Sequence, residues 1–111
     1  MDSFERANVF TVIDALGYEA GKAETVRVMS KTTGNVTLVA VDGGVITENT
    51  ASPFDTLLHL LEGSAEVTID RKSHHLTSGQ CIILPAHLGS NVISSQKFKM
   101  LLTTIKSGYE I

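Results

Sequence analysis

Residues 54–85 read FDTLLHLLEGSAEVTIDRKSHHLTSGQCIILP, and this stretch decides the fold. It contains three apolar runs of strand length, separated by short polar segments. Strands joined by such short turns pair as antiparallel hairpins. Gly63 and Gly79 fall between the runs, where tight turns favour glycine because it tolerates positive φ. The stretch therefore predicts antiparallel β-structure.

Further short strands are predicted on both sides of this stretch. Residues 24–29 alternate between polar and apolar side chains, which is the period of a half-buried strand. Residues 36–41 are rich in β-branched side chains, which favour strands. The other segments predicted as strands are 45–48, 91–94 and 97–106. Many short strands with closely spaced turns are typical of an all-β barrel or sandwich.

The chain has 111 residues and no break in composition, so a single domain covering residues 1–111 is predicted. Residues 1–22 are predicted to form an N-terminal arm. Within it, residues 8–13 are interpreted as a short edge strand or as a segment that reaches onto a neighbouring subunit. Asp14 and Gly17 are predicted to begin and end a single helical turn. Residues 107–111 are predicted to be a loose C-terminal end.

Composition excludes several classes of protein. The hydrophobic content of 42% and the charged content of 19% fit a compact globular protein. The net charge is −3 and no basic stripe is present, so no nucleic-acid partner is expected. No run approaches the ~20 apolar residues that span a bilayer, and the first residues do not resemble a signal peptide. We therefore expect no membrane association and a cytoplasmic location.

Cys81 is the only cysteine, so it cannot form a disulfide within the chain. It lies in the apolar run 81–84. A free cysteine in such a run usually behaves as a small hydrophobic residue. We therefore predict that Cys81 is buried and does not act as a nucleophile.

The sequence Leu-Leu-Glu-Gly-Ser at residues 60–64, followed by Gly79 and then Pro85 after five intervening residues, resembles the two-motif frame of the cupin superfamily. The resemblance covers roughly residues 34–106, and residues 97–102 resemble the last strand of small single-domain bacterial cupins. It implies an all-β cupin-type antiparallel β-barrel, also described as a double-stranded β-helix or jelly roll.

Members of this family typically bind a divalent metal through three histidines and one glutamate, a donor set that suits iron, manganese, nickel or zinc. Residue-by-residue counting from Gly63 and Pro85 places the ligand positions at Asn49 and Ala51 (or Thr50 and Ser52), Thr56 and Ser90. None of these positions holds an imidazole or a carboxylate. We therefore expect no transition metal and no other cofactor.

The run at residues 57–61 is apolar on both faces of its predicted strand, because successive side chains point to opposite faces. The side chains predicted to face the interior are Thr56, Leu58 and Leu60. Those predicted to face outward are Leu57, His59 and Leu61. A strand that is apolar on both faces is covered on both faces. In a small barrel with almost no helix, that cover is another subunit, so a homodimer is expected, with His59 at its interface.

The residues predicted to line a ligand cavity and its mouth are Asn49, Thr56, Leu58, Leu60, His87 and Ser90. A mostly apolar cavity of this kind takes small organic molecules. His87 follows Pro85 near the expected mouth, and an imidazole there suits a general acid or base. His74 and His75 are adjacent and therefore point to opposite faces of a strand. They are predicted to face solvent.

Three functions stay open at this point. The first is a metal-free cupin that binds a small organic ligand as a sensor, carrier or accessory module. The second is an enzyme, either a metal-free isomerase-like cupin that uses His87 or a metal enzyme with unusual ligands. The third is a vestigial barrel kept as a dimeric interaction module. The missing ligands favour the first or third, and no catalytic residue is assigned, because the fold alone does not decide function.

Overall fold

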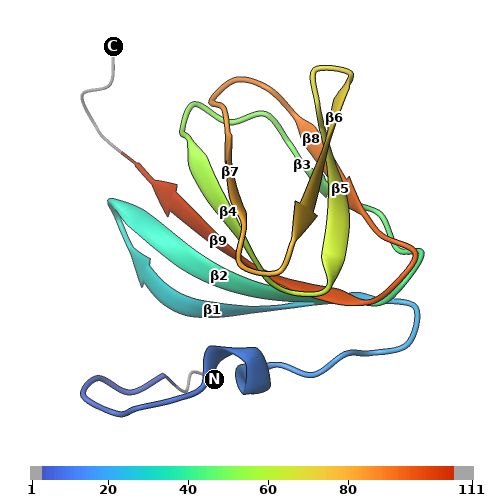
Figure 1. The fold of residues 1–111 in the computed structure, drawn as a ribbon. Helices are drawn as coiled ribbons and strands as arrows, with labels where there is room; N and C mark the ends of the chain where they lie inside the picture. The colour runs from blue at the N-terminus through green and yellow to red at the C-terminus, as the bar shows by residue number, and fades with distance from the viewer. Residues whose placement is uncertain (1–3, 107–111) are drawn as a thin grey trace.

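The computed structural model describes residues 4–106 and shows an almost entirely β protein (Figure 1). Its elements in chain order are η1 (Val12–Ala15), β1 (Ala23–Lys31), β2 (Gly34–Val41), β3 (Thr47–Asn49), β4 (Thr56–Glu62), β5 (Ser64–Ile69), β6 (Lys72–Thr77), β7 (Cys81–Leu84), β8 (Ser90–Ile93) and β9 (Phe98–Ile105). No helix in this part of the chain is long and apolar enough to cross a membrane. The predicted loose end at residues 107–111 lies outside the described residues.

The strands form two antiparallel sheets that face each other (Figure 1). One sheet has five strands in the order β1-β2-β9-β4-β7, and the other has four in the order β3-β8-β5-β6. The predicted antiparallel double-stranded β-helix is therefore confirmed. The two sheets share no strand, so they are not joined edge to edge into a closed barrel.

The hydrophobic core lies between the sheets and contains every second residue of the paired strands. In β4, Leu58 and Leu60 are fully buried, whereas Leu57 is 41% exposed. The predicted inward and outward faces of this strand are therefore confirmed. The core consists of Val39, Val41, Leu58, Leu60, Ala65, Val67, Ile69, Leu76, Leu84, Val92, Phe98 and Met100. Burial of these side chains is the main force that holds the two sheets together.

Gly63 marks the point where the chain passes from the five-stranded sheet to the four-stranded one. Its φ is +88°, and a β-carbon at this position would lie only 2.8 Å from the carbonyl oxygen of Lys97. Both the conformation and the close approach therefore require glycine. Gly79 also has positive φ, at +92°, so the prediction of glycine turns in this stretch is confirmed.

The N-terminal segment does not form the edge strand predicted at residues 8–13. Residues 8–11 are irregular, and η1 begins at Val12, two residues before the predicted cap. The segment cannot pair with a strand edge, because it crosses the outer face of the five-stranded sheet instead (Figure 1). Two hydrogen bonds hold it there: the Lys99 Nζ group donates to the Ile13 carbonyl, and the Tyr18 hydroxyl donates to Glu62. Burial and the Glu62 carboxylate raise the pKa of Tyr18 well above its ordinary value.

Two further predictions concern the end of the central stretch. Cys81 is exposed, so the prediction that it is buried is wrong. It lies on an edge strand opposite His59, on the outer side of the sheet, where no other layer covers it. His74 and His75 are exposed on β6, as predicted.

Asp42 fastens the end of the N-terminal segment to the end of β2. Its carboxylate accepts hydrogen bonds from the backbone N–H groups of Gly21 (2.7 Å) and Gly43 (2.9 Å). These two bonds lower the pKa of Asp42 below its usual value. A carboxyl group whose pKa is lower in the folded state than in the unfolded state stabilises the fold when the pH is above the unfolded-state pKa. That stabilisation is lost as the pH falls through the folded-state pKa.

We therefore expect Asp42→Asn to lower the Tm at neutral pH. The difference from the parent protein should shrink as the pH falls from about 4 toward about 2, where the parent carboxyl also becomes protonated. Thermal melts followed by circular dichroism across this range measure the difference. A difference that stays constant with pH would show that the charge of Asp42 contributes nothing.

Candidate functional site

A cavity of about 390 Å³ lies between the two sheets, next to the edge strands β1 and β3. Its floor includes apolar side chains, among them Val39, Met100 and Leu102. Around them stand hydroxyl and amide groups from both sheets. These polar lining residues are Thr25, Asn35, Thr37, Thr47, Asn49, Thr56 and Thr104. Glu48 is the one ionisable residue among the side chains that line this cavity.

The structure brings only part of the predicted ligand-binding set to this cavity. Asn49 and Thr56 line it. Leu58 and Leu60 do not, because they are completely buried in the core between the sheets. Ser90 is 7% exposed and is the backbone pairing partner of Asn49 on the neighbouring strand. It therefore lies beside Asn49 on the inner face of the four-stranded sheet.

His87 does not belong to the cavity lining. It is exposed in the loop between β7 and β8, where its φ is +73° and its backbone N–H donates to the Ser52 carbonyl. Sequence counting placed it near the mouth because it follows Pro85 closely. His87 is not among the residues that line the cavity, so its contact with a ligand at the mouth stays a prediction.

Asn49 and Ser90 present two polar atoms that need a partner. The Nδ2 atom of Asn49 and the Oγ atom of Ser90 are buried and form no hydrogen bond within residues 4–106. Most buried polar atoms in folded proteins are hydrogen-bonded, so two neighbouring exceptions call for an explanation. Directly paired residues on antiparallel strands hold their β-carbons about 4.5–5.5 Å apart. Of the two residues, Asn49 lines the cavity between the sheets, and Ser90 lies beside it on the neighbouring strand.

Other hydroxyl groups that line the cavity already form hydrogen bonds within the protein. The hydroxyls of Thr56 and Thr104 lie 2.8 Å apart and join β4 to β9. Thr47 donates its hydroxyl to the Val92 carbonyl at 3.3 Å. A hydroxyl that donates one hydrogen bond still has lone pairs to accept others. These threonines are thus fixed in orientation and retain the capacity to bind a donor.

The cavity residues do not fit a transition metal. The positions implied by the cupin resemblance hold Asn49, Ala51, Thr56 and Ser90, and Ala51 has no donor atom at all. Among residues 4–106 no group of three or more histidine, cysteine, aspartate or glutamate side chains is placed to hold an ion. Transition metals are bound by imidazole, thiolate and carboxylate ligands. We therefore assign no metal chemistry to this site.

A second groove, of about 450 Å³, lies on the other side of Asn49 and Ser90. It is lined by polar and charged residues of the four-stranded sheet and its turns: Glu48, Asn49, Thr50, Thr68, Asp70, Arg71, Gly89, Ser90 and Asn91. Asn49 therefore lines both openings, whereas Ser90 lines this second groove only. No pattern in the sequence indicates this groove, because its residues come from three separate segments, 48–50, 68–71 and 89–91.

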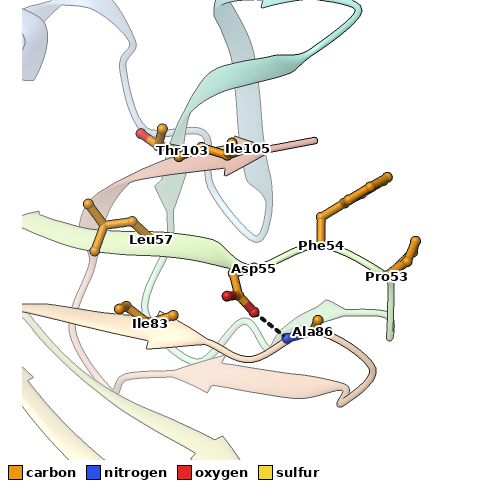
Figure 2. Close-up of a pocket in the computed structure, with 8 residues that line it drawn as sticks. All are labelled: Pro53, Phe54, Asp55, Leu57, Ile83, Ala86, Thr103 and Ile105. Atoms are coloured by element: carbon orange, nitrogen blue, oxygen red, sulfur yellow. Dashed lines mark hydrogen bonds between the residues drawn. The ribbon is translucent and has the colours of Figure 1, made fainter. Parts of the chain in front are cut away.

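A depression lined mainly by apolar side chains lies on the outer surface of the molecule. Figure 2 shows this groove, of about 450 Å³, on the outer face of β4, β7 and β9. It is lined by Pro53, Phe54, Asp55, Leu57, Ile83, Ala86, Thr103 and Ile105. Asp55 is its one charged residue, and its carboxylate accepts a hydrogen bond of 2.7 Å from the Ala86 N–H. The sequence predicted the outward position of Leu57, but not the contributions of Ile83 and Ile105.

Comparison of the sequence with models of known protein families gives no match, and comparison with curated proteins gives none either. Solved structures do resemble the chain. A conserved protein of unknown function from Streptococcus pyogenes is 25% identical, with a TM-score of 0.87 over 97% of this chain and 95% of that chain. A cupin superfamily protein from Desulfitobacterium hafniense is 19% identical, with a TM-score of 0.86 over 96% and 97%.

A third structure, the Cupin 2 conserved barrel domain protein from Leptotrichia buccalis, is 26% identical, with a TM-score of 0.81. The match covers 87% of this chain and 47% of that chain. Together with the two facing antiparallel sheets, these likenesses show that the chain has the cupin fold that the spacing of Gly63, Gly79 and Pro85 predicts.

Proposed function

We propose that this cupin-fold protein binds a small, uncharged organic molecule in the cavity between its sheets, without a transition metal. The observation that carries the proposal is the pair of buried, unpaired atoms on Asn49 and Ser90. Leaving a buried donor or acceptor unsatisfied costs about 1–3 kcal/mol. Because Asn49 lines the cavity, a ligand with a polar group beside it supplies a partner for the Asn49 amide and offsets part of this cost.

The chemistry of the two atoms narrows the class of ligand. The Asn49 amide nitrogen can only donate, whereas the Ser90 hydroxyl can donate or accept. A ligand hydroxyl or carbonyl oxygen meets both requirements. No lysine or arginine lines the cavity, and Glu48 is its one ionisable lining residue, so a bound anion would lack a counter-charge. A neutral molecule with hydroxyl or carbonyl groups and an apolar part fits best.

The volume and the surroundings support a binding role. A cavity of about 390 Å³ falls within the range of ligand pockets, ~300–1,000 Å³. His87 lies away from the cavity lining, so the proposal includes no catalytic residue. We place the protein in the cytoplasm, because the free, exposed thiol of Cys81 suits a reducing compartment.

A thermal-shift and native mass-spectrometry screen tests the proposal. The panel contains neutral polyols, sugars, lactones and amides, with carboxylates and phosphates of matching size as the charged comparison. We expect stabilisation by members of the neutral set and none by the anions. Stabilisation by anions alone would overturn the assignment of a neutral ligand.

Ser90→Ala supplies an independent test that needs no known ligand. Removing a buried hydroxyl that has no partner should leave the free energy of unfolding within about 1 kcal/mol of the parent value, or raise it. Thr47→Val is the matched control, because it removes a hydroxyl that is hydrogen-bonded and should cost about 0.5–1.5 kcal/mol. Urea denaturation measures both. A loss of more than about 2 kcal/mol in Ser90→Ala would mean that its hydroxyl already has a structural partner.

A further inference from the structure

We propose that the second groove, lined by residues 48–50, 68–71 and 89–91, binds a zwitterionic molecule of about dipeptide size. The second groove is distinct from the cavity between the sheets, with which it shares only Glu48 and Asn49. The inference does not depend on the ligand proposed for that cavity.

The strand register places part of the second groove on the outer face of the four-stranded sheet. Directly paired residues share a face of a sheet, and Asn91 pairs with Glu48 on one side and with Thr68 on the other. Their chain neighbours Val92 and Ile69 belong to the core, so this row points outward. Two strand spacings of ~4.8 Å make the row about 10 Å wide. An extended dipeptide, at roughly 7 Å, fits within that width.

The charged groups of the second groove lie on its two sides. Glu48 is on the edge strand β3, whereas Asp70 and Arg71 form the turn between β5 and β6, and β8 separates β3 from β5. All three side chains are exposed. Within residues 4–106 none of them forms an ion pair, whereas Glu66, on the same face of the sheet, pairs with His75 at 2.9 Å. The groove therefore offers a guanidinium group and two carboxylates that the described chain does not neutralise.

Two uncharged residues of the groove also carry polar atoms without a partner. Asn49 and Ser90 line the groove, and the Asn49 Nδ2 and Ser90 Oγ atoms are buried with no hydrogen bond inside the described part of the chain. Ser90 is only 7% exposed and does not line the cavity between the sheets, so the second groove is the opening next to it. Buried polar atoms normally have a partner. Their position here favours a polar occupant over an apolar one.

The turn that carries Arg71 has an unfavourable backbone conformation. The φ angles of Asp70 and Arg71 are +50° and +67°. A two-residue hairpin turn with positive φ at both positions usually ends in glycine, which adopts this conformation without steric cost. Strained backbone of this kind clusters at ligand-binding sites. We therefore assign the Arg71 side chain to binding.

A zwitterion satisfies both sides of the groove at once. Its carboxylate can accept two parallel hydrogen bonds from the Arg71 guanidinium, while its ammonium group lies beside Glu48. Two carboxylates and one guanidinium leave the groove with a net charge of −1, which disfavours a simple anion. A simple cation would leave the guanidinium without a partner. The volume of about 450 Å³ lies in the range of ligand pockets, ~300–1,000 Å³.

An NMR titration of the ¹⁵N-labelled protein with seryl-serine tests the site. We expect saturable shifts of the backbone signals of Arg71, Gly89 and Asn91, with a Kd on the order of 1 mM for a molecule of this size. N-acetyl-seryl-serine lacks the ammonium group and seryl-serinamide lacks the carboxylate. Each should bind about tenfold more weakly, because each loses a charge-assisted interaction. No saturable shift of these signals up to about 20 mM, or equal binding of either blocked peptide, overturns the proposal.

Substitutions at Arg71 test the position of the carboxylate. Arg71→Gln should weaken seryl-serine binding at least tenfold, and Arg71→Lys should recover part of the loss because it restores the charge. Arg71→Gly should also lose binding while raising the Tm, because glycine relieves the positive φ, so unfolding cannot explain its loss of binding. A folded Arg71→Gln or Arg71→Gly variant that binds like the parent overturns the proposal.

Two controls separate this site from its surroundings. Lys72→Gln removes the next positive charge along the chain, which belongs to a residue that does not line the groove, and should bind seryl-serine like the parent. Thr25→Val changes the lining of the cavity between the sheets only, and should also bind seryl-serine like the parent. A loss of binding in Thr25→Val would place seryl-serine in that cavity and would overturn the assignment to the second groove.

Discussion

Asn49→His combined with Ser90→His is expected to create a metal site where the parent protein has none. The two residues are directly paired on β3 and β8 and share the inner face, so two imidazoles can converge on one ion at ~2.0–2.1 Å. At a Zn²⁺ concentration 100-fold above the Kd, binding adds about 2.7 kcal/mol to the free energy of unfolding. For a domain of this size, that corresponds to a rise in Tm of roughly 10 °C or more.

The control keeps two new histidines but separates them. Asn49→His/Asn91→His places one imidazole on each face of the sheet, so they cannot bind the same ion. Differential scanning fluorimetry with Zn²⁺ and Ni²⁺ compares both variants with the parent, for which we expect almost no shift. Stoichiometric metal bound by the unmodified protein and lost on replacing Asn49 or Ser90 would contradict our account of the site.

Leu58→Ala is expected to be the most damaging conservative change in β4. Leu58 is completely buried at the centre of the core, and truncating a buried leucine to alanine costs about 2–5 kcal/mol in transfer and cavity terms. Since small domains are stable by only about 5–15 kcal/mol, much of the fold's stability would be lost. Leu88→Ala is the control, because Leu88 is 40% exposed in a loop and should cost under about 1 kcal/mol. Urea denaturation that shows equal losses for both variants would mean that Leu58 is not in the core.

The sequence predicts the strands well wherever alternation and burial act together. In β4 and β5 each second residue is buried, so local pattern and final environment agree. It predicts β6 less well, because Leu76 is the one apolar residue of this edge strand, which therefore shows no apolar run. It also wrongly predicts that Cys81 is buried, because an apolar run does not reveal whether another layer of the protein covers its strand. The prediction of an edge strand in the N-terminal segment is wrong for a related reason. The position of this segment depends on hydrogen bonds with Lys99 and Glu62, which are distant in the chain.

The candidate site is predictable at the level of strand register but not at the level of loops. Counting from Gly63 and Pro85 placed Asn49 and Ser90 at related positions, and the structure pairs them directly. His87 was expected near the mouth because it follows Pro85, but it is exposed in the loop between β7 and β8 and is not among the residues that line the cavity. Leu58 and Leu60 were assigned to a cavity because inward-facing residues of a barrel were expected to line one. In this small fold, their part of the interior is filled by side chains.

The position of β9 in the five-stranded sheet has a consequence for synthesis. Gly34 pairs with Ile105, so β9 lies between β2 and β4 although, among the strands of residues 4–106, it is the last to be synthesised. Until it emerges, the β1–β2 hairpin and the β4–β7 pair each present an unpaired edge, which is the kind of surface that recruits other chains. Sheets dominated by such distant pairings fold in milliseconds to seconds, whereas translation adds only about 5–20 residues per second. Nascent chains halted just before Phe98 should therefore be aggregation-prone and depend on chaperones, and chains released a few residues beyond Ile105 should not.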